Sequence, residues 1–168
     1  IGFRGFLDGT GVNSSNIRSI WSNGSGTLSL VAREGTQAVG TANGVQYDGI
    51  GLPVFNSAGQ TAFFAGLDGP GVNISNNTSL WSEGFGSLGI VARNGDQAPS
   101  LGADVQVSGI DLFQFRPVIN TAGQTAFRSV LIGPGFDISN SSVVLLEDSG
   151  SFSIVAQQGN QAPGLASG

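Results

Sequence analysis

Apolar and polar residues alternate along the chain in short runs, and Gly, Asn, Asp or Pro separates one run from the next. In the clearest run, 88–93, Leu88, Ile90 and Ala92 fall on one face of an extended chain, and the intervening residues fall on the other. A period of two is typical of a β-strand with one buried face, whereas a helix repeats every 3.6 residues. The pattern therefore predicts an all-β protein with essentially no helix.

The pattern recurs along the chain at a nearly fixed spacing. Val31-Ala32 returns as Val91-Ala92, and a more diverged third copy has Val155-Ala156 in the same place. The second interval is slightly longer than the first, and an insertion between Ile110 and Pro117 accounts for the difference. Such a period is typical of repeat architectures. We therefore interpret the chain as a single repeat array, incomplete at its start and its end, with repeats at 1–60, 61–124 and 125–168.

Each repeat contains four runs that predict short antiparallel strands. A weaker fourth strand is expected within Val105–Ile119. Pro117 in this segment, and Pro53 at the matching place in the previous repeat, indicate an edge or a bend, since proline cannot donate to a strand ladder. Four strands per repeat predict β-propeller-like blades, and a β-sandwich or a β-solenoid stack is the alternative. The first strand is expected at Ile1–Leu7, Thr61–Leu67 and Thr125–Leu131, the second around Leu80–Ser82, and the third at 88–93 and its copies.

One motif recurs near the boundary between repeats: the segment from Asn56 to Phe63, NSAGQTAF, returns from Asn120 to Phe127 as NTAGQTAF. Asn and Gly are turn residues, and Ala-Phe begins a strand that places Phe in the core. The motif resembles the NxxGxxAF tandem repeat of bacterial exported proteins of the choice-of-anchor type. That resemblance implies secretion and cell-surface display and implies no known activity. The structural motif residues are Asn56, Gly59, Ala62, Phe63, Asn120, Gly123, Ala126 and Phe127.

The composition removes most kinds of catalytic chemistry. Cys, His, Met and Lys are absent, and all six basic residues are Arg. Without Cys or His there is no Cys/His zinc site, no thiol nucleophile and no Ser-His-Asp relay, and without Lys there is no Schiff base or P-loop lysine. A net charge of −5 argues against a nucleic-acid partner, and no apolar run is long enough to span a bilayer. We expect neither an enzyme nor a transmembrane protein.

The loop after each first strand offers the best candidates for a cofactor, which would be calcium. Its Asp and Asn side chains supply the hard oxygen ligands that Ca²⁺ prefers, although the spacing is not that of an EF-hand. Asx turns need the same residue types, so turn formation is the competing interpretation. The calcium candidates are Asp8, Asn13, Asn16, Asp68, Asn73 and Asn76, and the glycosylation candidates in Asn-X-Ser/Thr triplets are Asn13, Asn73, Asn76 and Asn140.

The remaining acids do not form an obvious catalytic pair. Glu34, Asn94 and Gln158 share one repeat position, a variation that predicts a solvent-facing turn. Asp104 and Asp111 lie near the insertion and stay open as a carboxylate pair of the kind used in glycoside hydrolysis. We expect no catalytic residue in the chain.

Three sets of recurring residues predict structural roles. Arg33 and Arg93 end the third strand, where an arginine covers apolar surface or pairs with an acid, and Gln157 replaces them in the third copy. Gln37, Gln97 and Gln161 are expected to fasten turns. Core packing is expected for Trp21 and Trp81, since Leu145 replaces them, and for Phe3, Phe63 and Phe127.

These observations favour an extracellular structural or scaffold repeat protein. Its expected partners are further copies of itself, as an oligomer, a filament or a surface layer, or other surface proteins. The alternative is a ligand-binding β-propeller module, with glycans as the ligand. End-to-end association is the specific expectation, because an uncovered strand edge is a template for another chain.

Overall fold

The computed structural model describes residues 1–110 and 115–162, and within them it contains thirteen strands and no helix. The all-β expectation is confirmed. Gly and Asn turns separate strands of two to eight residues, as the short runs of the sequence predict. No helix able to cross a bilayer occurs in this described part of the chain. Asp111 lies outside the described residues.

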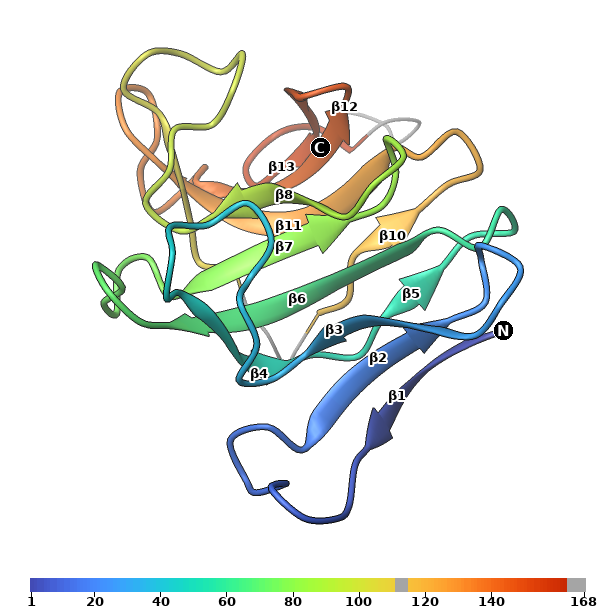
Figure 1. The fold of residues 1–168 in the computed structure, drawn as a ribbon. Coiled ribbons are helices and arrows are strands. Elements are labelled where there is room, and N and C mark those ends of the chain that lie inside the picture. The colour runs from blue at the N-terminus through green and yellow to red at the C-terminus, as the bar shows by residue number, and fades with distance from the viewer. Residues whose placement is uncertain (111–114, 163–168) are drawn as a thin grey trace.

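The strands form three antiparallel sheets that follow one another along the chain, and none closes on itself (Figure 1). The N-terminal sheet has the order β1-β2-β3, with β1 at Gly2–Phe6, β2 at Arg18–Ser22 and β3 at Ser29–Arg33. The middle sheet contains β4 (Gln46–Ile50), β5 (Val54–Phe55), β6 (Thr61–Asp68), β7 (Thr78–Ser82) and β8 (Gly89–Arg93). The C-terminal sheet contains β9 (Gln106–Ser108), β10 (Val118–Ile119), β11 (Thr125–Ile132), β12 (Ser142–Asp148) and β13 (Ser151–Gln157).

The expected fourth strand is two short strands rather than one. β4 and β5 both pair with β6, and β9 and β10 both pair with β11. Pro53 directly precedes β5 and Pro117 directly precedes β10, so each proline lies at the break, where its missing N–H removes no ladder bond. The middle and C-terminal sheets therefore each take an edge from the preceding segment of the chain.

Each sheet presents two rows of side chains, one on each face. Residues opposite one another on neighbouring strands share a face, so the pairing registers define the rows. The leading rows are Phe3–Trp21–Leu30, Phe63–Trp81–Ile90 and Phe127–Leu145–Ile154. The trailing rows, on the opposite faces, are Arg4–Ile20–Ala32, Phe64–Leu80–Ala92 and Arg128–Val144–Ala156. The expected common face of Leu88, Ile90 and Ala92 is therefore wrong, because a β-bulge between Leu80 and Trp81 puts Ile90 and Ala92 on opposite faces.

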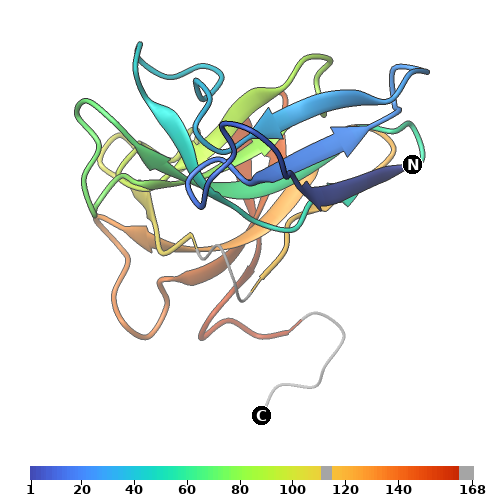
Figure 2. The same cartoon turned by 60° about the horizontal axis from the view of Figure 1, so that its bottom comes forward.

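The rows pack in order along the chain and make two cores. In the first, the trailing row of the N-terminal sheet meets the leading row of the middle sheet, with Ile20 and Ala32 in one cluster with Phe63 and Trp81. In the second, the trailing row of the middle sheet meets the leading row of the C-terminal sheet. The N-terminal and C-terminal sheets consequently lie on opposite sides of the middle one (Figure 2).

The middle sheet is buried on both faces. Every residue of β6 from Thr61 to Leu67 is buried, whereas β11 alternates between buried and less buried positions. Trp81 is fully buried, its ring packs edge-on against Tyr47 at 4.9 Å between centroids, and its Nε1 donates to the carbonyl of Val39. Such a strand carries more of the stability than one with a single covered face.

One burial prediction is wrong. Phe63 and Phe127 are buried, as expected, but Phe3 is 42% exposed. Trp21 is likewise only partly buried, while Trp81 is fully enclosed. The difference has a simple cause, because no described residue of another sheet covers the leading row of the N-terminal sheet.

Candidate functional site

The calcium candidates lie in the loops after β1 and β6, except Asp68, which ends β6 and pairs with Gln46. Asn13 Oδ1 accepts hydrogen bonds from the backbone N–H and the hydroxyl of Ser15, and Asn16 Oδ1 accepts from the Asn13 N–H. Asn16 Nδ2 donates to the carbonyl of Gly11. Asp8 Oδ1 accepts from the adjacent Gly9 N–H. These bonds are those of Asx turns, so they support the turn interpretation.

The same loop arrangement recurs in the other two copies. Asn73 and Asn76 repeat the bonds of Asn13 and Asn16, with Asn73 Oδ1 accepting from Ser75. In the third copy an acid takes the Asn73 position: Asp137 Oδ1 accepts from the hydroxyl and the N–H of Ser139, and the hydroxyl bond is the main reason that the pKa of this exposed carboxyl is lowered. Nowhere in 1–110 or 115–162 do three His, Cys, Asp or Glu side chains come close enough to hold a metal ion.

The recurring residue at the end of the third strand fastens this loop. Arg33 Nε donates to the carbonyl of Asn16, Arg93 Nε donates to the carbonyl of Asn76, and Gln157 Nε2 donates to that of Asn140. The common function is donation to a loop carbonyl, which explains why glutamine can replace arginine. Pairing with an acid was one of the two expected roles, and within the described part of the chain neither Arg33 nor Arg93 forms such an ion pair.

The NxxGxxAF motif forms a turn that its asparagine closes. Asn56 Oδ1 accepts from the N–H groups of Ala58 and Gln60 at 3.0 Å, and Asn56 Nδ2 donates to Gln60 Oε1. Asn56 Nδ2 also donates to the backbone carbonyl of Asn120 at 2.8 Å, so the two copies of the motif contact each other. Gln60 Nε2 donates to the carbonyl of Glu83 in the turn between β7 and β8.

The glycine of the motif makes a backbone contact with the preceding sheet. Gly59 has φ +81°, and a Cβ placed on it would overlap the Cα of Gly24 in the turn between β2 and β3. Gly123, at φ +86°, meets Gly84 in the turn between β7 and β8 in the same way. The motif therefore requires glycine for two reasons, the left-handed backbone and the close approach. Sequence reasoning identified only the turn, although Gly24 and Gly84 both follow Trp-Ser-x and share one repeat position.

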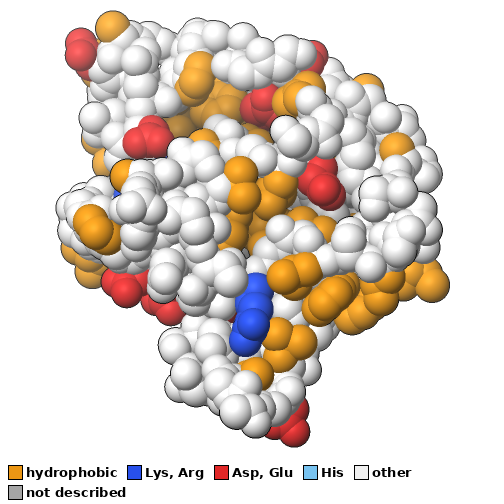
Figure 3. Space-filling model, in the orientation of Figure 1, with side chains coloured by type: hydrophobic (Ala, Val, Ile, Leu, Met, Phe, Trp, Pro, Cys, Tyr) orange, Lys and Arg blue, Asp and Glu red, His pale blue; other side chains and the backbone are white. Residues whose placement is uncertain are grey.

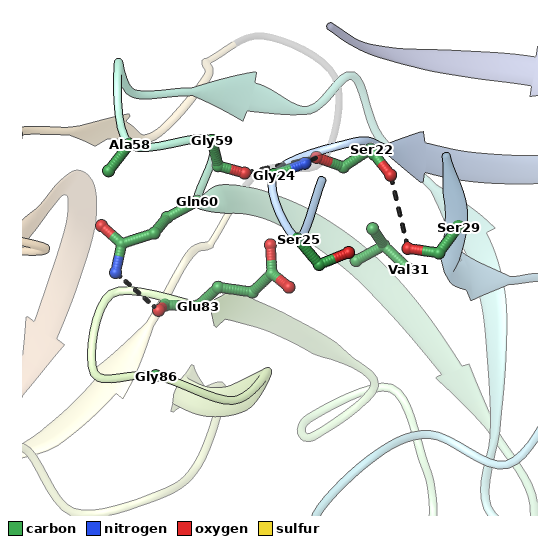
Figure 4. A pocket seen from close by; sticks show the side chains of 10 residues that line it. All are labelled: Ser22, Gly24, Ser25, Ser29, Val31, Ala58, Gly59, Gln60, Glu83 and Gly86. Carbon is green, nitrogen blue, oxygen red and sulfur yellow. Dashed lines mark hydrogen bonds between the residues drawn. The ribbon is translucent and has the colours of Figure 1, made fainter. Parts of the chain in front are cut away.

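A pocket of about 280 Å³ lies beside the Gly24–Gly59 contact (Figure 4). The Glu83 carboxylate points toward Ser25 across it, and Glu83 Oε2 accepts from the Thr61 N–H. A second pocket of about 290 Å³, lined by Asn56 and Phe55, lies on the other side of the same contact. The lining of the two pockets contains one carboxylate, so neither assembles the pair of acids that glycoside hydrolysis needs.

The interpretation of Glu34 as a solvent-facing turn residue is wrong. Glu34 is 2% exposed, and its Oε1 accepts from the guanidinium of Arg18 at 2.8 Å and from the Ile50 N–H at 3.1 Å. Its Oε2 accepts from the Arg18 N–H. Asn94 takes part of this role in the next sheet by accepting from the Ile110 N–H. The position joins the end of one sheet to the edge strand of the next, a role that an acid and an amide can both perform.

Glu147 is the second buried acid that sequence reasoning missed. It is 3% exposed, and its Oε1 accepts from the Gly150 N–H while Oε2 has no hydrogen-bond partner among the described residues. Burial raises the pKa of this carboxyl, and the nearby Asp148 adds to the rise. Glu147 has the same repeat position as Glu83, so the recurrence of an acid there was the available signal.

The acids of the described residues do not gather into one site. Asp104 is exposed, and acidic side chains are spread over the face shown in Figure 3. Asn140, the fourth glycosylation candidate, holds the third loop through Asp137 and Gly135. The recurring polar residues therefore build turns and joints between sheets, and no other described sheet covers the outer rows of the two terminal sheets.

A family model described as a family of unknown function (DUF7453) matches residues 1–168. The chain belongs to this family. No curated protein and no solved structure matches it.

Proposed function

We propose that the chain is a structural scaffold module of the bacterial cell exterior rather than an enzyme, and that its activity is the stacking of β-sheets. The observation that carries the proposal is the use of the recurring residues: Asn56, Gly59 and their copies at 120 and 123 link one sheet to the next through hydrogen bonds and a backbone contact. In an enzyme of tandem repeats, some recurring polar groups would instead converge on a ligand.

We further propose that the three sheets are successive β-propeller-like blades, with a β-sandwich or β-solenoid stack as the alternative. The face-to-face order of the rows and the edge strand taken from the preceding segment support blades. The location outside the cell rests on the resemblance of the NxxGxxAF motif. Fractionation of a producing cell, with the chain detected in the envelope or medium, tests it, and detection only in the cytoplasm contradicts it.

Light scattering and electron microscopy of the purified chain test the scaffold function. The mass should rise with protein concentration, and ordered assemblies should be visible at the highest concentrations. A particle of monomer mass at every concentration contradicts the proposal.

The second candidate is a ligand-binding module, which the two pockets beside the Gly24–Gly59 contact favour. Their lining is mostly polar and Glu83 is its one charged side chain, as suits a neutral, hydroxyl-rich ligand such as a glycan. A glycan array with wild type and Glu83→Gln tests it. A glycan bound by wild type and lost in the variant would favour this candidate over the scaffold.

A further inference from the structure

The leading row of the N-terminal sheet is an uncovered apolar surface. Phe3 is 42% and Leu30 46% exposed, and Leu28, beside Leu30 on the neighbouring turn, is 52% exposed. Figure 3 shows hydrophobic side chains on the lower part of the molecule, where β1 and β2 lie in Figure 1. Several adjacent exposed hydrophobic side chains on a flat sheet are the mark of an interaction surface.

The trailing row of the C-terminal sheet is the second surface that no other described sheet covers, although the Phe115 ring lies over its Arg128 end, with 4.6 Å between the guanidinium carbon and the ring centroid. A groove of about 270 Å³ runs across it, lined by Arg128, Val144 and Ala156 among others. Ala156 is exposed, and Val155 beside it is 57% exposed. The two surfaces lie at opposite ends of the stack of sheets (Figure 2).

The two uncovered rows are of the kinds that already pack together twice within the chain. Both internal cores join a trailing row to the leading row of the next sheet. We propose that the leading row of the N-terminal sheet binds the trailing row of the C-terminal sheet in a second copy of this chain, which continues the internal packing from one molecule to the next. The inference rests on the proposed scaffold function and names the surfaces that it uses.

The sizes of the side chains favour this pairing over contact between like faces. In the first core, the bulky Phe63 and Trp81 of a leading row meet the smaller Ile20 and Ala32 of a trailing row, and in the second core the trailing row contributes one ring, Phe64. Two leading rows would bring bulky rings together, whereas the groove over Ala156 leaves room for a ring. Packing that combines large with small side chains fills space best.

Arg128, which stacks on Phe115 of its own chain, is compatible with such a contact. Arg128, Phe64 and Arg4 occupy the same position in the trailing rows of the C-terminal, middle and N-terminal sheets. The trailing row of the N-terminal sheet is covered by the middle sheet although it contains Arg4, so an arginine at this position does not prevent packing. There Arg4 donates to the carbonyl of Ile50 across the joint between sheets. The leading row of the N-terminal sheet contains no charged residue that would repel Arg128. Because the two faces differ, the contact repeats from copy to copy and builds a filament unless a ring closes.

Cross-linking of engineered thiols tests the pairing, since the wild-type chain contains no cysteine. Leu30→Cys and Ala156→Cys each place one thiol on one of the two surfaces, at side chains that are already exposed. With a short bis-maleimide reagent, the mixture of the two variants should give a covalent dimer, and each variant alone should give none. Dimers from Leu30→Cys alone, or from Ala156→Cys alone, would show contact between like faces and overturn the inference.

A charge on the leading row gives an independent measurement. Leu30→Asp should abolish the rise of mass with concentration in light scattering, whereas Ile74→Asp, which changes a 92% exposed loop residue, should leave it intact. Equal thermal melts of both variants and wild type show that the fold is kept. Association that survives Leu30→Asp would overturn this inference and leave the scaffold function standing, whereas a wild type that stays monomeric would overturn both.

Discussion

Replacing Gly59 with alanine should destabilise the protein through the joint between the N-terminal and middle sheets. The methyl group meets two obstacles: Gly59 has φ +81°, and its Cβ would overlap the Cα of Gly24. The left-handed backbone costs an L-residue about 1–2 kcal/mol. Forcing an atom into a filled space costs about 1–3 kcal/mol more. The sum is a loss of about 2–5 kcal/mol in the free energy of unfolding.

Gly71→Ala is the matched control. Gly71 has φ +76°, and a Cβ on it would meet nothing within 4 Å, so only the backbone term of about 1–2 kcal/mol applies. Urea unfolding followed by Trp fluorescence measures both variants against wild type. If Gly59→Ala costs no more than Gly71→Ala, the close contact between the turns does not hold the sheets together, and the structural reason for the motif glycine is wrong.

Three further predictions concern side chains. Phe63→Ala should cost about 3–5 kcal/mol of stability, whereas Phe3→Ala, on the uncovered row, should cost about 1 kcal/mol; equal losses in urea unfolding would contradict the assigned burial. Glu34→Ala should cost about 2–4 kcal/mol, because it leaves two backbone N–H groups without an acceptor, and Glu34→Gln should cost less. Because burial raises the pKa of Glu147, stability should fall as pH rises from the ordinary glutamate pKa through the raised one. Glu147→Gln should remove that fall. If the melting temperature of Glu147→Gln depends on pH as that of wild type does, the fall does not come from Glu147.

The strands could be predicted from the sequence because each is a local pattern. Alternation located β3, β8 and β13, and the motif located the start of β6 and β11. The pairing register was not predicted, because a β-bulge between Leu80 and Trp81 shifts the pairing of β7 with β8 and leaves no signal in the alternation. The fourth strand was a second exception. Its two halves, β4 and β5, both pair with β6, which follows them in the chain. Pro53 indicates the break between them but not the strand with which they pair.

Burial was harder to predict, because it depends on which sheet covers which face. Phe3 and Phe63 have the same place in the repeat, but only Phe63 has a sheet in front of it. Glu34 was misjudged for a related reason. Its replacement by Asn94 looks like surface variation, although Glu34 accepts the N–H of Ile50 in β4 and Asn94 accepts that of Ile110 just after β9. Sequence variation at a position therefore does not distinguish an exposed residue from a buried acceptor.

Hydrogen–deuterium exchange of the wild-type chain at low and high concentration tests the central claim most directly, because it follows every sheet at once. At low concentration, β6 and β7 should exchange slowest, since the middle sheet is covered on both faces. At high concentration, exchange should slow in β1–β3 and in β11–β13 and stay unchanged in β6 and β7. Exchange that is independent of concentration in all three sheets would contradict the account of this chain as a stacking scaffold.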